Sequence, residues 1–141
     1  MSVTKIMTQR VVTIGMDDKL STVKDIFDHC QFSHLLVVDG GVLVGVVSDS
    51  DLFKALSPNI GTATESYKDA ATLNKRVHQI MTRKPFVLNE QASVDDAIDL
   101  FNAHRISCIP IVNLGNKVVG IVSWRDVLRS IRKGNDGLAT N

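Results

Sequence analysis

The sequence predicts a mixed α/β fold (α+β in its arrangement) made of two similar halves, each in the order strand, helix, strand, strand, helix. The first observation is a repeat: VTKIMT at residues 3–8 returns as VHQIMT at residues 77–82. The second is that GVVSDSDL at residues 45–52 returns as GIVSWRDV at residues 120–127. Between these motifs, each half changes from β-branched runs to apolar residues at helical spacing. A chain that matches itself in register over both halves is a tandem duplication.

Composition is typical of an ordinary soluble globular protein. Of the 141 residues, 44% are hydrophobic and 22% are charged, and the net charge of +1 offers no electrostatic footprint for nucleic acid. No apolar run approaches the roughly 18 residues that span a bilayer, and the N-terminus lacks the apolar region of a signal peptide. The two cysteines, Cys30 and Cys108, make no disulfide framework. We therefore expect a cytoplasmic location without a membrane partner.

Each half begins with a short helical turn and a brief strand. Apolar residues at positions i, i+3 and i+4 predict the turn at residues 3–7 and again at residues 77–81. A short apolar run follows at residues 11–14 and at residues 86–88, which we expect to be extended.

An amphipathic helix comes next in each half. Its apolar stripe consists of Leu20, Val23, Ile26, Phe27 and Cys30 in the first half, and of Val94, Ala97, Ile98 and Phe101 in the second. Ser21 and Ser93 lie near the helix starts, where a side-chain oxygen can cap free amide groups. Both helices are therefore expected to bury one face.

Two strands and a final helix complete each half. Strands are expected at residues 35–38 and 42–47 around Asp39-Gly40-Gly41, and at residues 109–112 and 117–122 around residues 113–116. Glycine beside Asp or Asn between β-branched runs is a hairpin signal. The final helices carry matching apolar residues, which are Leu52, Phe53 and Leu56, and Val127, Leu128 and Ile131.

These elements divide the chain into four parts. We expect the first repeat at residues 1–57, a partly helical linker at 58–76, the second repeat at 77–133 and a disordered tail at 134–141. The linker begins with the polar, turn-rich stretch SPNIGTATES. The two repeats are expected to form one compact module.

Each final strand ends on a cluster of small polar and acidic residues. The clusters are Ser48, Ser50 and Asp51 in the first half, and Ser123, Arg125 and Asp126 in the second. A carboxylate at such a junction can accept hydrogen bonds from both ribose hydroxyls, and the first amides of the next helix suit a phosphate. Arg125 adds a guanidinium fork that matches phosphate oxygens. The alternative is that the serines and aspartates only cap their helices.

The chain contains two copies of h-x-x-I-M-T, the strand segment HRISCIPIV at residues 104–112, and two copies of G-h-h-S-x-x-D. In these motifs it resembles a cystathionine-β-synthase (CBS) domain pair, also called a Bateman module. The resemblance covers nearly the whole chain, about residues 1–133. It implies two βαββα repeats packed sheet to sheet about a pseudo-twofold axis, with two equivalent clefts. Those clefts commonly hold adenosine ligands such as AMP, ADP, ATP or S-adenosylmethionine.

The resemblance also implies which residues contact a ligand. In that family the threonine of the I-M-T segment and the residues just before the IPIV-type strand touch the nucleoside. Here these are Thr8 and Thr82, together with Phe32, Ser33, His34, Ile106, Ser107 and Cys108. One cleft would combine Ser48, Ser50 and Asp51 with Thr82, Ile106 and Ser107, and the other would combine Ser123, Arg125 and Asp126 with Thr8, Phe32 and Ser33. Core packing is an equal alternative for Phe32 and Ile106, because large apolar residues are mostly inside.

The two clusters differ in charge at their variable positions. Asp49 corresponds to Trp124, and Ser50 corresponds to Arg125. A second carboxylate beside a phosphate site is repulsive, whereas a guanidinium is attractive. The second cluster is therefore expected to hold phosphorylated nucleosides more tightly than the first.

Catalytic and metal motifs are missing from the sequence. The four histidines have no triad-like context, there is no Walker or G-x-G-x-x-G loop, and the His and Cys residues of each half are too few for a zinc site. We therefore predict a regulatory protein rather than an enzyme, which binds an adenosine nucleotide, needs no obligatory cofactor, forms a homodimer and signals to an effector protein in trans. The alternative is an interaction module whose clefts are empty or hold another ligand, such as S-adenosylmethionine or nucleic acid.

Overall fold

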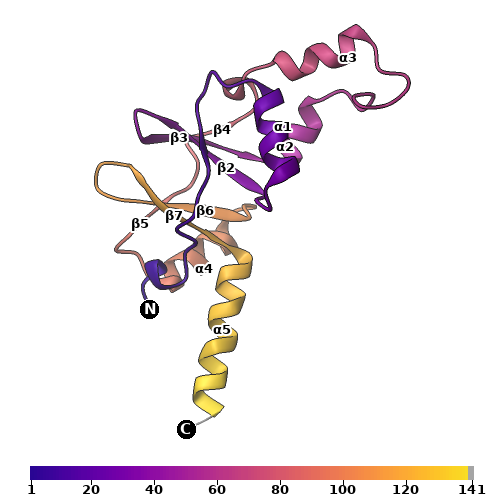
Figure 1. The fold of residues 1–141 in the computed structure, drawn as a ribbon. Coiled ribbons are helices and arrows are strands. Elements are labelled where there is room, and N and C mark those ends of the chain that lie inside the picture. The colour runs from indigo at the N-terminus through magenta and orange to yellow at the C-terminus, as the bar shows by residue number, and fades with distance from the viewer. Residues whose placement is uncertain (140–141) are drawn as a thin grey trace. The chain divides into compact units, whose positions relative to one another are not determined.

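The structure is a computed structural model that describes the backbone of residues 1–139 and the side chains of residues 1–132. The chain forms two compact units, and these do not coincide with its two halves (Figure 1). The middle unit consists of residues 12–84, and the split unit consists of residues 1–11 together with the chain from residue 85 onward. The leading turn of each repeat therefore belongs to the unit formed mainly by the other repeat.

The middle unit contains a four-stranded sheet in the order β1-β2-β3-β4. Its elements are β1 (Thr13–Ile14), α1 (Leu20–His29), β2 (His34–Asp39), β3 (Val42–Ser48), α2 (Asp49–Ala55), α3 (Tyr67–Ala71), the 3-10 turns η2 (Thr72–Asn74) and η3 (Val77–Gln79), and β4 (Thr82–Arg83). Strand β1 runs parallel to β2, while β2 and β3 form an antiparallel hairpin and β4 pairs antiparallel with β3.

The split unit repeats this plan with a three-stranded sheet in the order β5-β6-β7. Its elements are the 3-10 turn η1 (Val3–Lys5), β5 (Leu88–Asn89), α4 (Val94–Ala103), β6 (Cys108–Val112), β7 (Val118–Ser123) and α5 (Trp124–Ala139). Strand β5 is parallel to β6, and β6 is antiparallel to β7. Thr8 forms an isolated antiparallel bridge with Ile121 of β7, at the position where Thr82 of β4 pairs with Val46 of β3. The predicted fold class and the βαββα order are confirmed.

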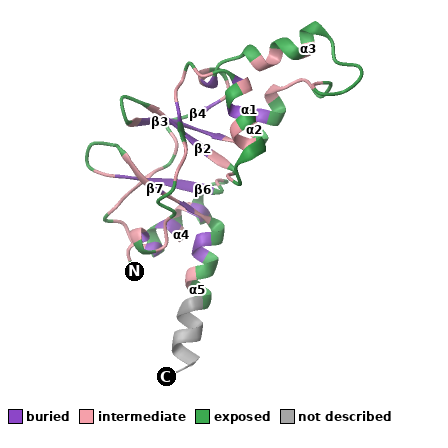
Figure 2. Ribbon diagram, in the orientation of Figure 1, coloured by how far each residue is buried: buried purple, intermediate pink, exposed green. Residues whose placement is uncertain are grey.

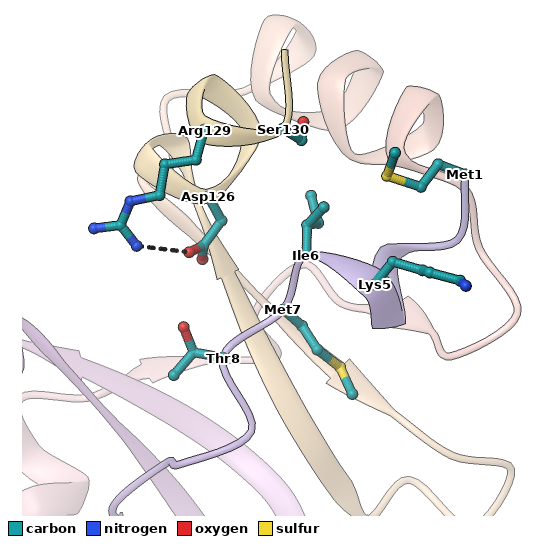
Figure 3. A pocket seen from close by; sticks show the side chains of 8 residues that line it. All are labelled: Met1, Lys5, Ile6, Met7, Thr8, Asp126, Arg129 and Ser130. Atoms are coloured by element: carbon teal, nitrogen blue, oxygen red, sulfur yellow. Dashed lines mark ion pairs between the residues drawn. The ribbon is translucent and has the colours of Figure 1, made fainter. Parts of the chain in front are cut away.

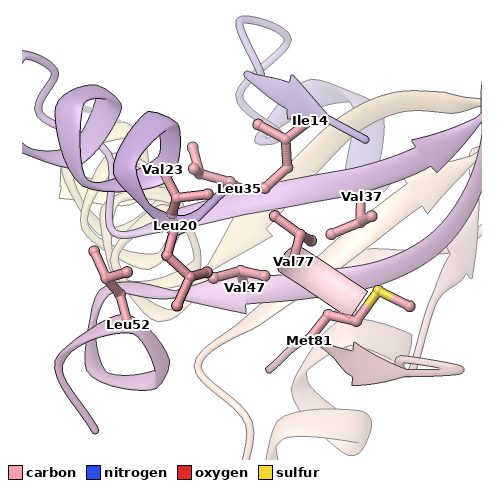
Figure 4. Packing of buried hydrophobic residues seen from close by; sticks show 9 residues of the cluster. All are labelled: Ile14, Leu20, Val23, Leu35, Val37, Val47, Leu52, Val77 and Met81. Atoms are coloured by element: carbon pink, nitrogen blue, oxygen red, sulfur yellow. The ribbon is translucent and has the colours of Figure 1, made fainter. Parts of the chain in front are cut away.

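Each unit has its own hydrophobic core, as the burial pattern in Figure 2 shows. In the middle unit, Leu20 and Val23 of α1 pack with Leu35 and Val47 of the sheet, and all four are fully buried (Figure 4). Val77 joins them from the leading turn of the second repeat, which fixes that turn in the middle unit. The split-unit core uses Val3 of η1, Ala97 and Phe101 of α4, and Ile109, Ile111 and Val122 of the sheet.

Close backbone approach explains the glycine in each G-h-h-S-x-x-D motif. A Cβ atom added to Gly45 would lie 2.8 Å from Sδ of Met81 and 3.0 Å from the carbonyl oxygen of Thr82. One added to Gly120 would lie 2.5 Å from Sδ of Met7 and 3.0 Å from the carbonyl oxygen of Thr8. The glycine of one repeat and the methionine of the other repeat's I-M-T segment therefore fit together in both units.

The hairpin turns follow the expected chemistry. Gly40 and Gly41 have φ values of 58° and 83° between β2 and β3, and Asn116 has a φ of 58° between β6 and β7. These are left-handed conformations, which glycine and asparagine adopt most readily.

Helix boundaries differ from the sequence expectation in three places. The N-cap of α1 is Lys19, which makes no side-chain capping bond, so Ser21 lies inside the first turn, whereas Ser93 does cap α4. Helix α1 ends at His29, so Cys30 leaves the apolar stripe and is exposed. The tail was expected to be disordered from residue 134, but α5 runs to Ala139. Adding a residue to an existing helix is easier than starting a new one. Residues 140–141 lie outside the described residues. Over the described part of the chain, no helix combines the length and the apolar character needed to cross a membrane.

Candidate functional site

The two strand-to-helix junctions are capping boxes. The Ser48 backbone N–H donates to Oδ2 of Asp51 at 2.9 Å, and the Asp51 N–H donates to Ser48 Oγ at 3.1 Å. At the second junction the Ser123 N–H donates to Oδ2 of Asp126 at 2.8 Å, and the Asp126 N–H donates to Ser123 Oγ at 3.3 Å. The capping interpretation of these residues is therefore correct at both ends, and it leaves one carboxylate oxygen of each aspartate outside the box.

Asp126 is the buried polar residue of this site, with 8% of its surface exposed. Its Oδ2 also accepts a hydrogen bond from Ser123 Oγ at 3.1 Å, while its Oδ1 lies 3.9 Å from a terminal guanidinium nitrogen of Arg129. A buried carboxylate is costly unless it is hydrogen-bonded or paired. Here Oδ2 of Asp126 accepts hydrogen bonds at the start of α5, and Oδ1 makes only a distant contact with the guanidinium of Arg129.

A cavity of about 550 Å³ lies within the split unit, between η1 and the start of α5. Figure 3 shows Asp126, Arg129 and Ser130 reaching it from α5, opposite Ile6 and Lys5 of the leading segment. Its lining residues are Met1, Lys5, Ile6, Met7, Thr8, Asp126, Arg129 and Ser130. Apolar side chains, two hydroxyls, a carboxylate and two cations are the mixture expected of a site for a polar small molecule.

Sequence reasoning identified Thr8 and Asp126 in this cavity and missed Arg129 and Ser130. The bridge between Thr8 and Ile121 holds the threonine in the split unit, with backbone hydrogen bonds of 2.8 and 3.0 Å in the two directions. Arg125, expected to contact a phosphate, is exposed and does not line the cavity. Helical periodicity was the missed signal, because residues three and four positions after Asp126 share its face of α5.

The matching residues of the middle unit lie around the end of β3. Ser48 Oγ and Ser50 Oγ are 3.0 Å apart, and Ser50 is exposed at the start of α2. Thr82 is exposed on β4, where it pairs with Val46, two residues before Ser48. The middle unit therefore brings Ser48, Ser50, Asp51 and Thr82 to one end of its sheet.

The residues before β2 are tied to α2. The Asp49 N–H donates to the Ser33 carbonyl oxygen at 3.0 Å, and Ser33 Oγ lies 3.1 Å from Nδ1 of His34. Burial lowers the pKa of His34 below its usual value of 6.5, although the carboxylates of Asp49 and Asp51 act in the opposite direction. Phe32 is half-buried and packs against the middle-unit core, as the packing alternative describes.

The residues before β6 are tied to α5 in the same way. The Trp124 backbone N–H donates to the Ser107 carbonyl oxygen at 3.4 Å, and its indole N–H donates to the Ile106 carbonyl oxygen at 3.2 Å. Trp124 also stacks on Phe101 with ring centroids 4.9 Å apart. Ile106 packs against the split-unit core. Cys108 is buried, and burial raises the pKa of its thiol to about 12.

The expected ligand sets drew residues from both repeats. Thr8 with Asp126, and Thr82 with Ser48, share a unit. Phe32 and Ser33 belong to the middle unit while Ser123 belongs to the split unit, so the grouping of those residues stays a prediction. Within the described residues, no group of three or more His, Cys, Asp or Glu side chains is arranged to hold a metal ion.

Comparison with known families gives one match that occurs twice. The family model described as "CBS domain" matches residues 3–58 and again residues 77–133. Each match covers one repeat, from its leading turn to its final helix.

Solved structures with this fold include several short chains of similar length. A protein of Vibrio cholerae assigned to acetoin utilization superposes with a TM-score of 0.80 at 20% identity, covering 100% of this chain and 97% of that one. The CBS-pair protein CBSX2 of Arabidopsis thaliana gives a TM-score of 0.78 at 24% identity, covering 96% of both chains, and CBSX2 has also been solved in complex with AMP. A CBS domain pair solved with 5′-methylthioadenosine and S-adenosyl-L-methionine gives 0.73 at 27% identity, covering 93% and 99%.

Curated relatives are longer proteins. Inosine-5′-monophosphate dehydrogenase of Methanocaldococcus jannaschii is 26% identical over 89% of this chain, and homoserine O-acetyltransferase of Methanococcoides burtonii is 28% identical over 92%. The chain spans only 22% and 24% of the lengths of these two relatives.

Proposed function

This chain is a tandem pair of CBS domains and belongs to that family, and we propose that it is a regulatory module. It binds an adenosine nucleotide, which is AMP, ADP or ATP, and it signals to an effector protein whether the nucleotide is bound. Relatives with the same fold support the ligand class. One is described in complex with AMP, another in complex with ATP, and a third with 5′-methylthioadenosine and S-adenosyl-L-methionine. Adenosine is the part that all these ligands share.

The observation that carries the proposal is the position of Asp126 at the split-unit cavity. Its carboxylate is buried, its Oδ2 caps α5, and the residue lines a cavity that Thr8 also lines. Such a carboxylate can accept hydrogen bonds from the two vicinal hydroxyls of a ribose, as an acidic residue does in dinucleotide-binding folds. Capping and ribose binding are compatible, because they use different oxygens of the same side chain.

A matched pair of variants separates ribose binding from capping. Asp96 forms the same capping box with Ser93 at the start of α4, in the same unit, with hydrogen bonds of 2.9 and 3.1 Å, and it does not line the cavity. Loss of either cap should cost about 1 kcal/mol of stability. Only Asp126→Ala should also weaken adenosine and AMP binding, by about 1.5–3 kcal/mol, the range for hydrogen bonds to charged groups.

The experiment is a thermal-shift screen with AMP, ADP, ATP and S-adenosylmethionine, followed by calorimetric titration of the ligand that stabilises the protein. Asp126→Ala and Asp96→Ala are titrated beside the wild type, and Asp51→Ala tests the corresponding junction of the middle unit. If Asp126→Ala and Asp96→Ala bind the ligand equally well, Asp126 is a cap alone and the proposed ribose contact is wrong.

Two observations favour the alternative functions. The CBS pair solved with S-adenosyl-L-methionine is 27% identical to this chain, which makes that compound the second candidate ligand. Exposed apolar side chains on α2 and α5, Phe53, Leu128 and Ile131, favour an interaction module and a homodimer. A protein that no adenosine compound stabilises, but that associates through these helices, would fit the interaction module instead.

The module itself is proposed to be regulatory rather than catalytic. Enzymes among its relatives match this chain over about a third of their length or less, so the shared part is the CBS pair and not the whole enzyme. The effector is expected to be reached in trans.

A further inference from the structure

We propose that Arg129, rather than Arg125, is the residue that selects an anionic group on the ligand of the split-unit cavity. This inference rests on the proposed binding of an adenosine compound and specifies the charge of that compound. A phosphorylated adenosine should bind more tightly than uncharged adenosine, and more tightly than S-adenosylmethionine with its cationic sulfonium.

The guanidinium of Arg129 is held loosely. Its terminal nitrogen lies 3.9 Å from Oδ1 of Asp126, and 67% of the Arg129 side chain is exposed. A contact at that distance, with the guanidinium mostly in solvent, contributes little to stability, and a guanidinium has five N–H donors. Most of these donors are thus available to a ligand that enters beside Asp126.

The spacing of charges on α5 fits a ribose that carries a phosphate. Asp126 and Arg129 are three residues apart, on the same face of the helix, and both line the cavity (Figure 3). The carboxylate suits the ribose hydroxyls, and an adjacent guanidinium suits the phosphate of the same nucleotide in bidentate fashion. A cationic sulfonium placed there would instead meet a like charge.

The rest of the lining adds to the preference for an anion. Lys5 places a second cation on the opposite side of the cavity from Arg129, and Ser130 adds a hydroxyl (Figure 3). The Lys5 backbone N–H donates to the Ser2 carbonyl oxygen, but its side-chain ammonium forms no hydrogen bond or ion pair within the described residues 1–132. The cavity thus carries two cationic side chains and one carboxylate.

The middle unit lacks this combination at the corresponding positions. There the repeat places Lys54 where the split unit has Arg129, but Gln79 replaces Lys5 and Ala55 replaces Ser130. Asp49 adds a carboxylate to the first turn of α2. The preference for an anionic ligand should therefore be stronger in the split unit.

The test compares AMP with adenosine, because the two differ only in the phosphate. Both are titrated by calorimetry into the full-length wild type, Arg129→Gln, Lys5→Gln and Arg125→Gln. Arg125→Gln is the matched control, since it removes the same charge four residues earlier on α5 at a position that does not line the cavity. A competition titration with S-adenosylmethionine completes the set.

We expect Arg129→Gln to weaken AMP binding roughly tenfold and to leave adenosine binding nearly unchanged, with a smaller loss for Lys5→Gln. The preference of the wild type for AMP should also shrink as salt is added, because the side chains are exposed. An AMP-to-adenosine ratio in Arg129→Gln equal to that in Arg125→Gln overturns this inference while the proposed function stands. A wild type that binds neither of these compounds, and neither ADP nor ATP, overturns both.

Discussion

Gly120 of β7 lies directly against Met7 of the leading segment, and an added Cβ would sit 2.5 Å from the methionine sulfur. The carbonyl oxygen of Thr8 lies 3.0 Å from the same position and is part of the backbone that bridges to Ile121. Real Cβ atoms do not approach other atoms this closely, so any side chain at residue 120 must displace Met7 and strain the bridge.

The first prediction is that Gly120→Ala destabilises the protein by about 1–3 kcal/mol, the usual cost of overpacking a filled site. Chemical denaturation monitored by circular dichroism measures this change. Gly115→Ala is the control, because its Cβ would meet only an ordinary contact at 3.5 Å and its φ is not in the left-handed region. Adding Met7→Ala to Gly120→Ala should recover part of the loss, and strictly additive effects of the two changes would contradict a direct contact.

The second prediction concerns pH and His34. Burial lowers its pKa in the folded state below the unfolded value of about 6.5, so the unfolded chain binds the proton more readily. Stability is therefore present above pH 6.5 and is lost as the pH falls from there towards the folded-state pKa. His34→Gln should flatten the pH dependence of the unfolding free energy in that range. Equal pH slopes for wild type and His34→Gln would show that His34 does not contribute.

The third prediction separates the two thiols. Cys30 is exposed, whereas Cys108 is buried and its pKa is raised to about 12. Because the thiolate is the reactive form, a disulfide reagent should label one thiol rapidly in the native protein and the second only after unfolding. Cys30→Ser should abolish the rapid phase, and a rapid phase that survives in this variant would mean that Cys108 is accessible.

The fourth prediction is a homodimer through the exposed apolar faces of α2 and α5. Phe53 is 72% exposed and Leu128, its counterpart in the other repeat, is 60% exposed. Large apolar side chains exposed on a helix in this way are typical of an interface. Light scattering across a dilution series should give a dimer for the wild type and a monomer for the double variant Phe53→Lys, Leu128→Lys.

The control for that prediction is Leu114→Lys. Leu114 is 95% exposed, but it belongs to the hairpin turn between β6 and β7 and to neither of the two helices. This variant should remain a dimer. A wild type that scatters as a monomer at every concentration would rule out the proposed assembly.

Much of the fold could be predicted because the duplication doubles each signal. The hydrophobic spacing that predicts α1 recurs in α4, and the glycine-containing turn between β2 and β3 has its counterpart between β6 and β7. The capping residues at the two junctions were also visible, since Ser48 and Ser123 are each followed three residues later by an aspartate. Local chemistry determines these features, so local sequence is sufficient to find them.

Other features depend on which distant segments meet. The leading turn with Val77 would have the same sequence pattern in either unit. It belongs to the middle unit because β4, which follows it, pairs with β3, and because Val77 packs in the middle-unit core. Arg129 was missed for a related reason. The repeat drew attention to position 125 because it varies between the halves, whereas the face of α5 that lines the cavity is set by helical geometry. The end of the stripe at Cys30 depended on where α1 stops, which is among the least certain features of a sequence pattern.

The exchange of leading segments between the repeats also constrains how the chain can be divided. A cut in the linker would leave one fragment with β1, β2 and β3 but without Val77 and β4, and the other fragment without Val3 and the bridge at Thr8. Each fragment would hold the piece that the other needs, so the two should reconstitute the protein when mixed. A chain with a single repeat could complete its sheet only by domain swapping with a second copy. Joining two copies end to end makes that swap intramolecular, at an effective concentration that dilution cannot lower.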